Sequence, residues 1–167
     1  MKLLKLSAVR KKPQMPVVSS PKPLIVPDTN VIVSAGTIAQ GPPAQVMQAW
    51  RGGDIRVATS APILREVADV LSRPYFVNVS GWTPKRIAIY LDELRGGAHI
   101  VPGRTATRVS VDPDDDKLFA CAVEAHADYI VSGDEKHVLP VGTYEGIQAI
   151  SPRDFVDTVL EPRKQAA

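Results

Sequence analysis

Short apolar runs alternate with helix-like segments along almost the whole chain, and this alternation limits the fold more than any other feature. Five runs are compact and rich in β-branched residues, and they cover 24–26, 54–60, 99–101, 128–132 and 146–150. Strands that are nearly all apolar must be covered on both faces, which is typical of a parallel sheet. The sequence therefore predicts an α/β fold with a mainly parallel central sheet of about five strands and helices on both faces.

The segments between these runs begin and end with residues that are typical of helix termini. The segment 41–53 has two prolines near its start and ends in two glycines. Ser60, Thr83 and Ser151 are N-cap candidates, because each is followed by a proline in the first turn. An acid three residues after Ser151 completes a pattern close to a capping box, which predicts a short helix there.

Charge is unevenly distributed, and this suggests where the domain begins. Six of the 20 basic residues lie in the first 23 positions, which contain no acid: Lys2, Lys5, Arg10, Lys11, Lys12 and Lys22. Residues 24–167 therefore hold 14 basic and 18 acidic residues, a net charge of −4. We expect a basic N-terminal arm over 1–23, one domain over 24–160 and a C-terminal tail over 161–167. A chain of 167 residues suffices for one domain core and is too short for two.

The cysteine count and the lengths of the apolar runs bear on the compartment. The single cysteine, Cys121, excludes an internal disulfide, and its apolar neighbours predict a buried core thiol. No apolar run approaches the ~20 residues that a membrane span needs. The first segment lacks the long apolar stretch and cleavage site of a signal peptide. We expect a cytoplasmic location with no membrane association.

Carboxylates occur where the predicted strands end and helices begin. Asp28 and Asp134 follow two of the apolar runs, and Glu66 lies one turn into the helix after another run. A fourth acid, Asp116, begins a helix at the end of the acid-rich stretch "DPDDD". In parallel sheets ligands bind beyond the carboxyl ends of the strands, where such acids can converge. Clustered carboxylates repel one another unless a divalent cation holds them, and oxygen ligands suit Mg²⁺ or Mn²⁺.

Each acid taken alone has a simpler explanation. Asp28 and Asp134 can be turn formers, Glu66 can lie on a solvated helix face, and the acid-rich stretch can cap a helix. The three histidines are scattered and lack the spacing of zinc ligands. Composition and periodicity therefore predict a metal site on an α/β fold and assign no reaction.

Three stretches of the chain together resemble the PIN-domain family, in particular the small ribonucleases that act as toxins in VapBC-type toxin–antitoxin pairs. The stretches are "LIVPDTNV", "SAPILREVADVL" and "DPDDDKLFACAVEAHADYIVSGD", and the resemblance extends over residues 24–156. It implies a three-layer sandwich with a catalytic and metal-binding set of four acids: Asp28, Glu66, Asp116 and Asp134. It also implies supporting roles for Asn30 and Ser132. Asp115 and Asp112 stay second choices for the third acid, because several aspartates follow one another closely and the spacing alone does not single out one of them.

The activity implied by the resemblance is divalent-metal-dependent hydrolysis of RNA, with 5′-phosphate and 3′-hydroxyl products. A protein antitoxin is the implied partner, and a homodimer is compatible with this assignment. Basic residues near the acidic edge can contact RNA phosphates or simply be solvated: Arg65, Arg73, Lys85, Arg86, Lys117, Lys136 and His137. Two alternatives stay open, a non-catalytic binding module and a metal-dependent phosphatase of haloacid-dehalogenase type. The phosphatase would require an aspartate where this chain has Asn30.

Overall fold

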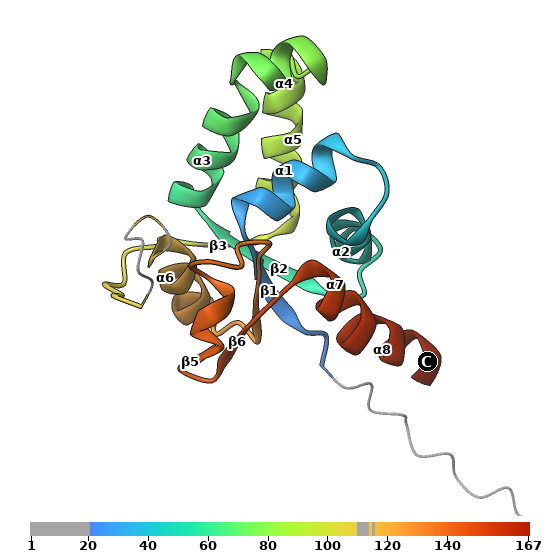
Figure 1. Ribbon diagram of the computed structural model, residues 1–167, viewed down its shortest axis with the longest axis vertical. Helices are drawn as coiled ribbons and strands as arrows, with labels where there is room; N and C mark the ends of the chain where they lie inside the picture. The colour runs from blue at the N-terminus through green and yellow to red at the C-terminus, as the bar shows by residue number, and fades with distance from the viewer. Residues whose placement is uncertain (1–20, 110–113, 115) are drawn as a thin grey trace, which may run out of the picture.

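The computed structural model describes residues 21–109, 114 and 116–167, which form a central sheet surrounded by helices (Figure 1). The strands are β1 (Leu24–Pro27), β2 (Arg56–Ser60), β3 (His99–Val101), β4 (Tyr129–Val131), β5 (Thr143–Tyr144) and β6 (Ile147–Ile150). Their order in the sheet is β3-β2-β1-β4-β6-β5, and every neighbouring pair is parallel except β5 and β6. The predicted α/β fold with a mainly parallel sheet is therefore confirmed, with one strand more than expected.

Helices connect the strands and cover the sheet. They are α1 (Thr29–Thr37), α2 (Pro42–Arg51), α3 (Ala61–Leu71), α4 (Pro74–Val79), α5 (Pro84–Gly97), α6 (Asp116–Ala125), α7 (Pro152–Phe155) and α8 (Glu161–Ala166). A single turn of 3₁₀-helix, η2 (Leu139–Val141), follows β4, and a π-helical stretch, η3 (Val156–Leu160), joins α7 to α8. Helix α6 packs against the four strands β1 to β4, while α1 packs against α2 and α3.

The core lies on both faces of the central strands. All four residues of β1 are buried, which requires cover on each side of the sheet. The largest fully buried side chains include Phe119 of α6 and Phe155 of α7. Cys121 is buried in the same core, as predicted, and this burial raises the pKa of its thiol to about 12.

The sequence analysis did not predict helices α1, α4 and α8 or strand β5. Helix α1 begins directly after Asp28, where the residues Val31, Ile32 and Val33 have low helix propensity. Strand β5 has only two residues and turns into β6 through Glu145 and Gly146, both with positive φ (49° and 79°). Positive φ at both positions is typical of a tight two-residue hairpin loop, and glycine adopts it without strain.

At two of the three predicted N-cap positions, the side chain makes the capping hydrogen bond. The Thr83 hydroxyl accepts the Arg86 N–H (3.2 Å) at the start of α5. The Ser151 hydroxyl accepts the Asp154 N–H (3.1 Å) and donates to the Asp154 carboxylate (2.8 Å). Ser60 precedes α3 as expected, but its side chain makes no capping hydrogen bond. From Ser151 the helical path continues to Ala166, through the segment expected as a tail.

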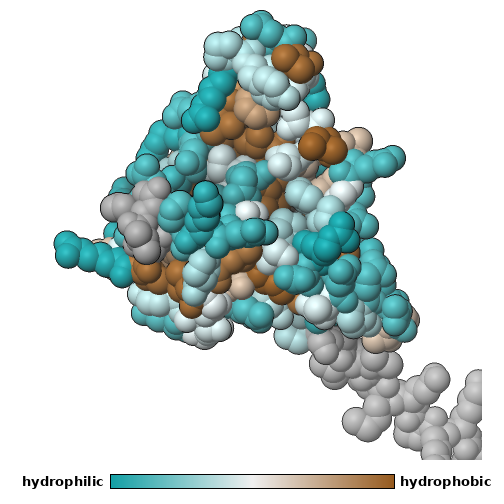
Figure 2. Space-filling view, viewed as in Figure 1, coloured by the Kyte–Doolittle hydropathy of each residue, from teal (hydrophilic) through white to brown (hydrophobic). Residues whose placement is uncertain are grey.

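The surface is mostly hydrophilic. Some hydrophobic residues are exposed on it, including several at the end of the molecule that carries α4 and α5 (Figure 2). The large exposed apolar residues on these two helices are Tyr75, Val77, Val79 and Ile89. Over the described ranges, no helix has both the length and the apolar character to cross a membrane.

We predict that Ser151→Ala lowers the free energy of unfolding by about 1 kcal/mol, because the variant loses the reciprocal cap with Asp154 at the start of α7. Urea denaturation measures the change. Ser80→Ala is the matched control, since Ser80 ends α4 without a capping side chain. An equal loss in both variants would contradict this role of Ser151.

Candidate active site

The site begins where β1 ends, at Asp28. The N–H of Asp28 donates to the Val131 carbonyl (2.9 Å), which continues the pairing of β1 with β4 for one more residue. The Asp28 carbonyl accepts the Val31 and Ile32 N–H groups in the first turn of α1. The side chain is thereby fixed at the strand-to-helix junction, and the residue is only 7% exposed.

Two neighbours donate hydrogen bonds to the Asp28 carboxylate. The Ser132 hydroxyl lies 2.6 Å from Asp28 Oδ2, and the Asn30 side-chain amide lies 3.1 Å from the same oxygen. The Asn30 carbonyl oxygen in turn accepts the Gly133 N–H (3.1 Å). Hydrogen-bond donors offset the cost of burying a carboxylate, so Asn30 and Ser132 both stabilise the Asp28 side chain at this position.

Ser132 also links Asp28 to Asp134. Its side chain is fully buried at the end of β4, and its oxygen accepts the Asp134 N–H (3.0 Å) while its proton goes to Asp28. Neighbouring parallel strands thus bring two acids that are distant in sequence to one edge of the sheet.

The Asp134 carboxylate is held by the turn that follows it. Oδ1 accepts the N–H groups of Lys136 and His137 (both 2.9 Å), and Oδ2 lies 3.1 Å from His137 Nδ1. Desolvation opposes ionisation of Asp134, but the hydrogen bonds from His137 and Lys136 prevail and hold its pKa below the usual range. Asp134 is therefore an anion at neutral pH.

Glu66 reaches the same edge from α3 and is balanced by a lysine. One of its oxygens accepts a short hydrogen bond from the Thr29 hydroxyl, and the other lies 3.0 Å from Lys117 Nζ. Thr29 directly follows Asp28, and Lys117 lies in the first turn of α6. Sequence analysis missed both partners of Glu66, because separations of 37 and 51 residues leave no local signal.

Asp116 is the first residue of α6 and is turned toward the loop before it. Its Oδ1 accepts the Val109 N–H (3.0 Å), and its carbonyl accepts the Thr107 hydroxyl (2.9 Å). A carboxylate in the first helical turn is also stabilised by the helix dipole. The alternatives Asp112 and Asp115 lie outside the described residues, so the choice among the three stays a prediction.

Glu124, which the sequence analysis did not select, anchors the loop that leads toward Asp116. Its carboxylate accepts the N–H groups of Gly103 (2.6 Å), Arg104 (2.6 Å) and Thr105 (2.7 Å), and the Thr105 hydroxyl (3.0 Å). Desolvation opposes its ionisation, but these donors outweigh it and lower the pKa of Glu124. Gly103 is required here, since its φ is 69° and an added Cβ would lie 2.9 Å from Ser60 Cβ.

Shared side-chain partners link three of the four predicted acids, and the fourth lies next to one of these partners in the chain. Asp28 and Asp134 share Ser132, Glu66 joins them through Thr29, and Asp116 lies next to Lys117, the partner of Glu66. Within the described part of the chain, no three acidic, histidine or cysteine side chains meet closely enough to hold a metal ion. The donor set nevertheless fits Mg²⁺ or Mn²⁺, because carboxylate, amide and hydroxyl oxygens are the ligands that these ions prefer.

Comparison with known families decides the classification. The PIN domain profile matches residues 24–136, which is most of the chain and includes all four acids. The chain belongs to the PIN-domain family. The predicted resemblance is therefore confirmed.

Solved structures and curated proteins give further comparisons. A chain from the crystal structure of VapBC2 from Rickettsia felis bound to a DNA fragment from their promoter is 12% identical, with a TM-score of 0.52, and the match covers 77% of this PIN protein and 98% of that chain. The T. brucei RRP44 PIN domain is 15% identical, with a TM-score of 0.48, over 87% of this chain and 85% of that one. At 12% identity, the likeness to the VapBC2 chain concerns the fold alone. No curated protein sequence matches.

We predict that Ser132→Ala destabilises the PIN domain by about 1–3 kcal/mol, because a buried Asp28 carboxylate loses a donor and the Asp134 N–H loses its acceptor. Urea unfolding at neutral pH gives the value. Ser80→Ala serves again as the control, and a loss for Ser132→Ala no larger than this control would show that the link is not important for stability.

We also predict that the stabilising effect of Glu124 depends on pH. A carboxyl whose pKa is lowered by folding contributes stability above its unfolded pKa of about 4.3, and this contribution is lost as the pH falls through the folded value. Glu124→Gln should therefore be less stable than the wild type at pH 7, and the difference should shrink toward pH 3. Thermal unfolding across this range tests the effect, with the exposed Glu135→Gln as control; a pH-independent difference would contradict it.

Proposed function

We propose that this PIN protein is a divalent-metal-dependent ribonuclease and the toxin of a toxin–antitoxin pair. The observation that carries the proposal is the link Asp28–Ser132–Asp134, in which one buried hydroxyl joins two acids at the ends of adjacent parallel strands. Membership of the PIN-domain family and the oxygen-rich donor set support it. The antitoxin, a dimeric state and a cytoplasmic location belong to the same proposal.

In this mechanism the metal ligands are Asp28, Glu66, Asp116 and Asp134. These residues would hold Mg²⁺ or Mn²⁺, and the chemistry that such an ion would supply there is a water of lowered pKa and neutralisation of charge on the scissile phosphate. Asn30 and Ser132 hold the Asp28 carboxylate in position through their hydrogen bonds. Attack of water on phosphorus releases the 3′-oxygen and leaves the phosphate on the 5′ side of the next nucleotide.

Lys117 has a defined place in this scheme. Its ammonium now balances Glu66 at 3.0 Å, with the two side chains 22% and 36% exposed. With a cation bound at Glu66, the Lys117 ammonium would be available as a donor to a phosphate oxygen of RNA. Lys117 directly follows Asp116 in the first turn of α6, so its positive charge belongs to the acidic edge that the polyanion would approach.

The polar neighbours of Asp28 favour nuclease over phosphatase chemistry. A haloacid-dehalogenase-type phosphatase needs a second aspartate two residues after the first, as a proton donor and acceptor. Here Asn30 occupies that position and uses its amide N–H to hold Asp28 and its carbonyl to hold Gly133. An amide can donate and accept in this way, whereas an ionised aspartate would repel Asp28.

We predict that Asp28→Asn lowers Mn²⁺-dependent cleavage of single-stranded RNA by at least about 100-fold, because the site loses one ligand charge. The variant should fold normally, since an asparagine oxygen can still accept from Ser132 and Asn30. Gel analysis of labelled RNA measures cleavage. Thermal scans with and without Mn²⁺ measure binding, and the stabilisation by Mn²⁺ should be present in the wild type and reduced in the variant.

Matched variants in the acid run control this experiment. Asp116→Asn should have the same two effects as Asp28→Asn, whereas Asp114→Asn should retain activity, because Asp114 is exposed. Loss of activity in Asp115→Asn with retention in Asp116→Asn would shift the third ligand by one residue. Full activity in Asp28→Asn would overturn the proposed function, and Mn²⁺ binding without cleavage by the wild type would identify a binding module.

A further inference from the structure

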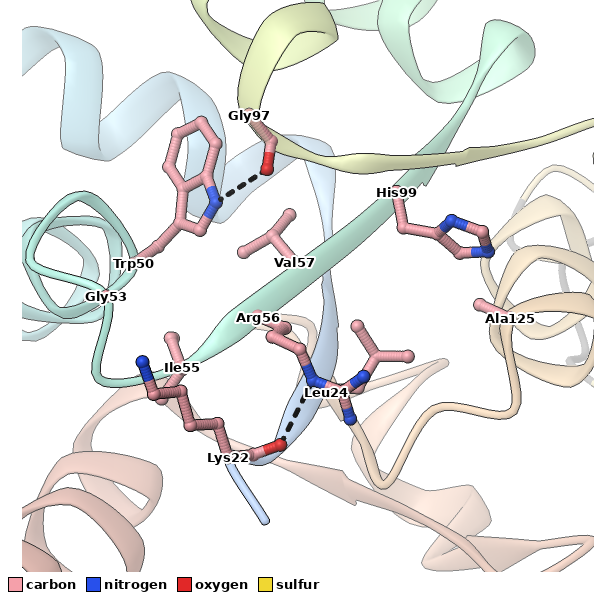
Figure 3. A pocket seen from close by; sticks show the side chains of 10 residues that line it. All are labelled: Lys22, Leu24, Trp50, Gly53, Ile55, Arg56, Val57, Gly97, His99 and Ala125. Carbon is pink, nitrogen blue, oxygen red and sulfur yellow. Dashed lines mark hydrogen bonds between the residues drawn. The ribbon is translucent and has the colours of Figure 1, made fainter.

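Helix α5 is firmly packed on one face and exposed on the other. Its inner face carries four buried residues, Ile87, Tyr90, Leu91 and Leu94. The Tyr90 hydroxyl donates to the Ile32 carbonyl of α1 (2.8 Å). At the end of the helix, the Trp50 indole N–H donates to the Gly97 carbonyl (3.4 Å), beside a cavity of about 490 Å³ at the edge of the sheet opposite the candidate active site (Figure 3). The exposed face of α5 therefore belongs to a well-anchored helix.

A basic, an apolar and an acidic residue follow one another along this exposed face. Lys85, Ile89 and Asp92 are four and three residues apart, so they lie on the same side of the helix. Ile89 is 61% exposed, and the Asp92 side chain is 75% exposed. The small residue Ala88, next to Ile89, is exposed as well. The face is thus positive at its start, apolar in the middle and negative toward its end.

Helix α4 adds apolar surface near the start of α5. None of its six residues is buried, and three of them are large exposed hydrophobic residues, namely Tyr75, Val77 and Val79. Together with Ile89 they make up four of the six such residues in the described part of the chain. Exposed apolar residues gathered in one region, with charged residues around them, are typical of a protein–protein interface.

The position of Lys85 is unfavourable for the isolated protein. Lys85 lies in the first turn of α5, where the helix dipole disfavours a cation. The neighbouring Arg86 is compensated, because it donates to the Ser80 carbonyl (3.0 Å) and its guanidinium lies 4.2 Å from the centre of the Trp82 ring. Lys85 forms no ion pair with any residue that the structure describes. An anion from another molecule would remove this cost.

A second copy of α5 in the antiparallel direction supplies that anion. The two-fold axis of such a pair would pass between Ala88 and Ile89. Lys85 and Asp92 lie equally far from this axis on either side, so Lys85 of one copy faces Asp92 of the other, and symmetry repeats the contact. Parallel helices would bring like charges together instead. Asp92 pairs with the exposed Arg95 of its own chain (3.2 Å), a contact of little energetic value that leaves its side chain accessible.

We propose that α5 of this PIN protein packs against α5 of a second copy in an antiparallel dimer, with Ile89 at the centre and Lys85–Asp92 ion pairs at both ends. The exposed residues of α4 then lie near the end of the other helix, where the space around Gly96 is open. The inference rests on the dimeric state included in the proposed function and assigns a surface to it. It does not depend on ribonuclease activity.

Sedimentation velocity of the full-length protein over a range of concentrations measures the Kd of the dimer. Ile89→Ala should raise this Kd at least about tenfold, because both copies lose apolar contact area beside the axis. Ile38→Ala is the matched control, since Ile38 is 60% exposed and follows α1, the helix that contacts the inner face of α5. The control should change the Kd less than about twofold.

Exchange of the charges tests the orientation of the helices. Lys85→Asp and Asp92→Lys, each alone, place like charges opposite one another and should each raise the Kd at least about tenfold. The double variant Lys85→Asp/Asp92→Lys restores opposite charges and should dimerise within about threefold of the wild type. Lys164→Asp makes the same charge change on the exposed face of α8 and should have an effect below about twofold.

The proposal is overturned if the wild type is monomeric at every concentration, or if the Ile89 and Lys85 variants dimerise as tightly as their controls. A dimer that is weakened by both single charge variants and not restored by the double variant overturns the antiparallel pairing. A monomer that cleaves RNA would contradict this inference and leave the ribonuclease activity in place. A dimer with the predicted variant effects but no cleavage would do the reverse.

Discussion

The parallel pairing of β1 with β4 is the interaction on which the candidate site depends. Ile25 pairs with Tyr129, Val26 with Ile130 and Pro27 with Val131, and the next residue on each strand is polar. A shift of one residue would turn every side chain to the other face of the sheet, so the buried residues of both strands fix this register. The polar residues that follow are then forced together, and the Ser132 hydroxyl meets the Asp28 carboxylate at 2.6 Å.

The acids at this edge are stabilised by many donors of different kinds. Asp28 uses side-chain donors, Asp134 uses the backbone of a turn, and Glu66 uses a lysine and a threonine. Of these three acids, Asp134 is held ionised by its donors, because the hydrogen bonds from His137 and Lys136 lower its pKa. Glu66 differs from Asp134 in that its partners are the side chains of Thr29 and Lys117, whereas Asp134 accepts from the backbone N–H groups of Lys136 and His137.

The two edges of the sheet differ chemically for reasons of topology. In a parallel sheet all strands begin at one edge and end at the other, so helices begin near the acids and end near the opposite edge. Helix starts favour carboxylates, as at Asp116, and helix ends favour cations, as around Lys22 and Arg56.

The sheet, most of the connecting helices and the acids that follow the strands could be predicted from the amino-acid sequence. These features depend on local signals, such as the apolar runs, the Ser151 cap and the turn residues after β4, so they can be read over short distances. Helix α1 was not predicted, because its β-branched residues have low helix propensity. It forms because Val31, Ile32 and Val33 are buried in the core, and this packing stabilises the helix.

The groups that balance each acid could not be predicted, because they come from distant parts of the chain. The contacts of Glu66 with Thr29 and Lys117 cross 37 and 51 residues, and Ser132 reaches Asp28 across 104. The cavity at the opposite edge likewise combines Lys22 with Gly97 and Ala125, which no local pattern connects. Such contacts arise when strands and helices pack in three dimensions, because packing places side chains by position in the fold and not by distance along the chain.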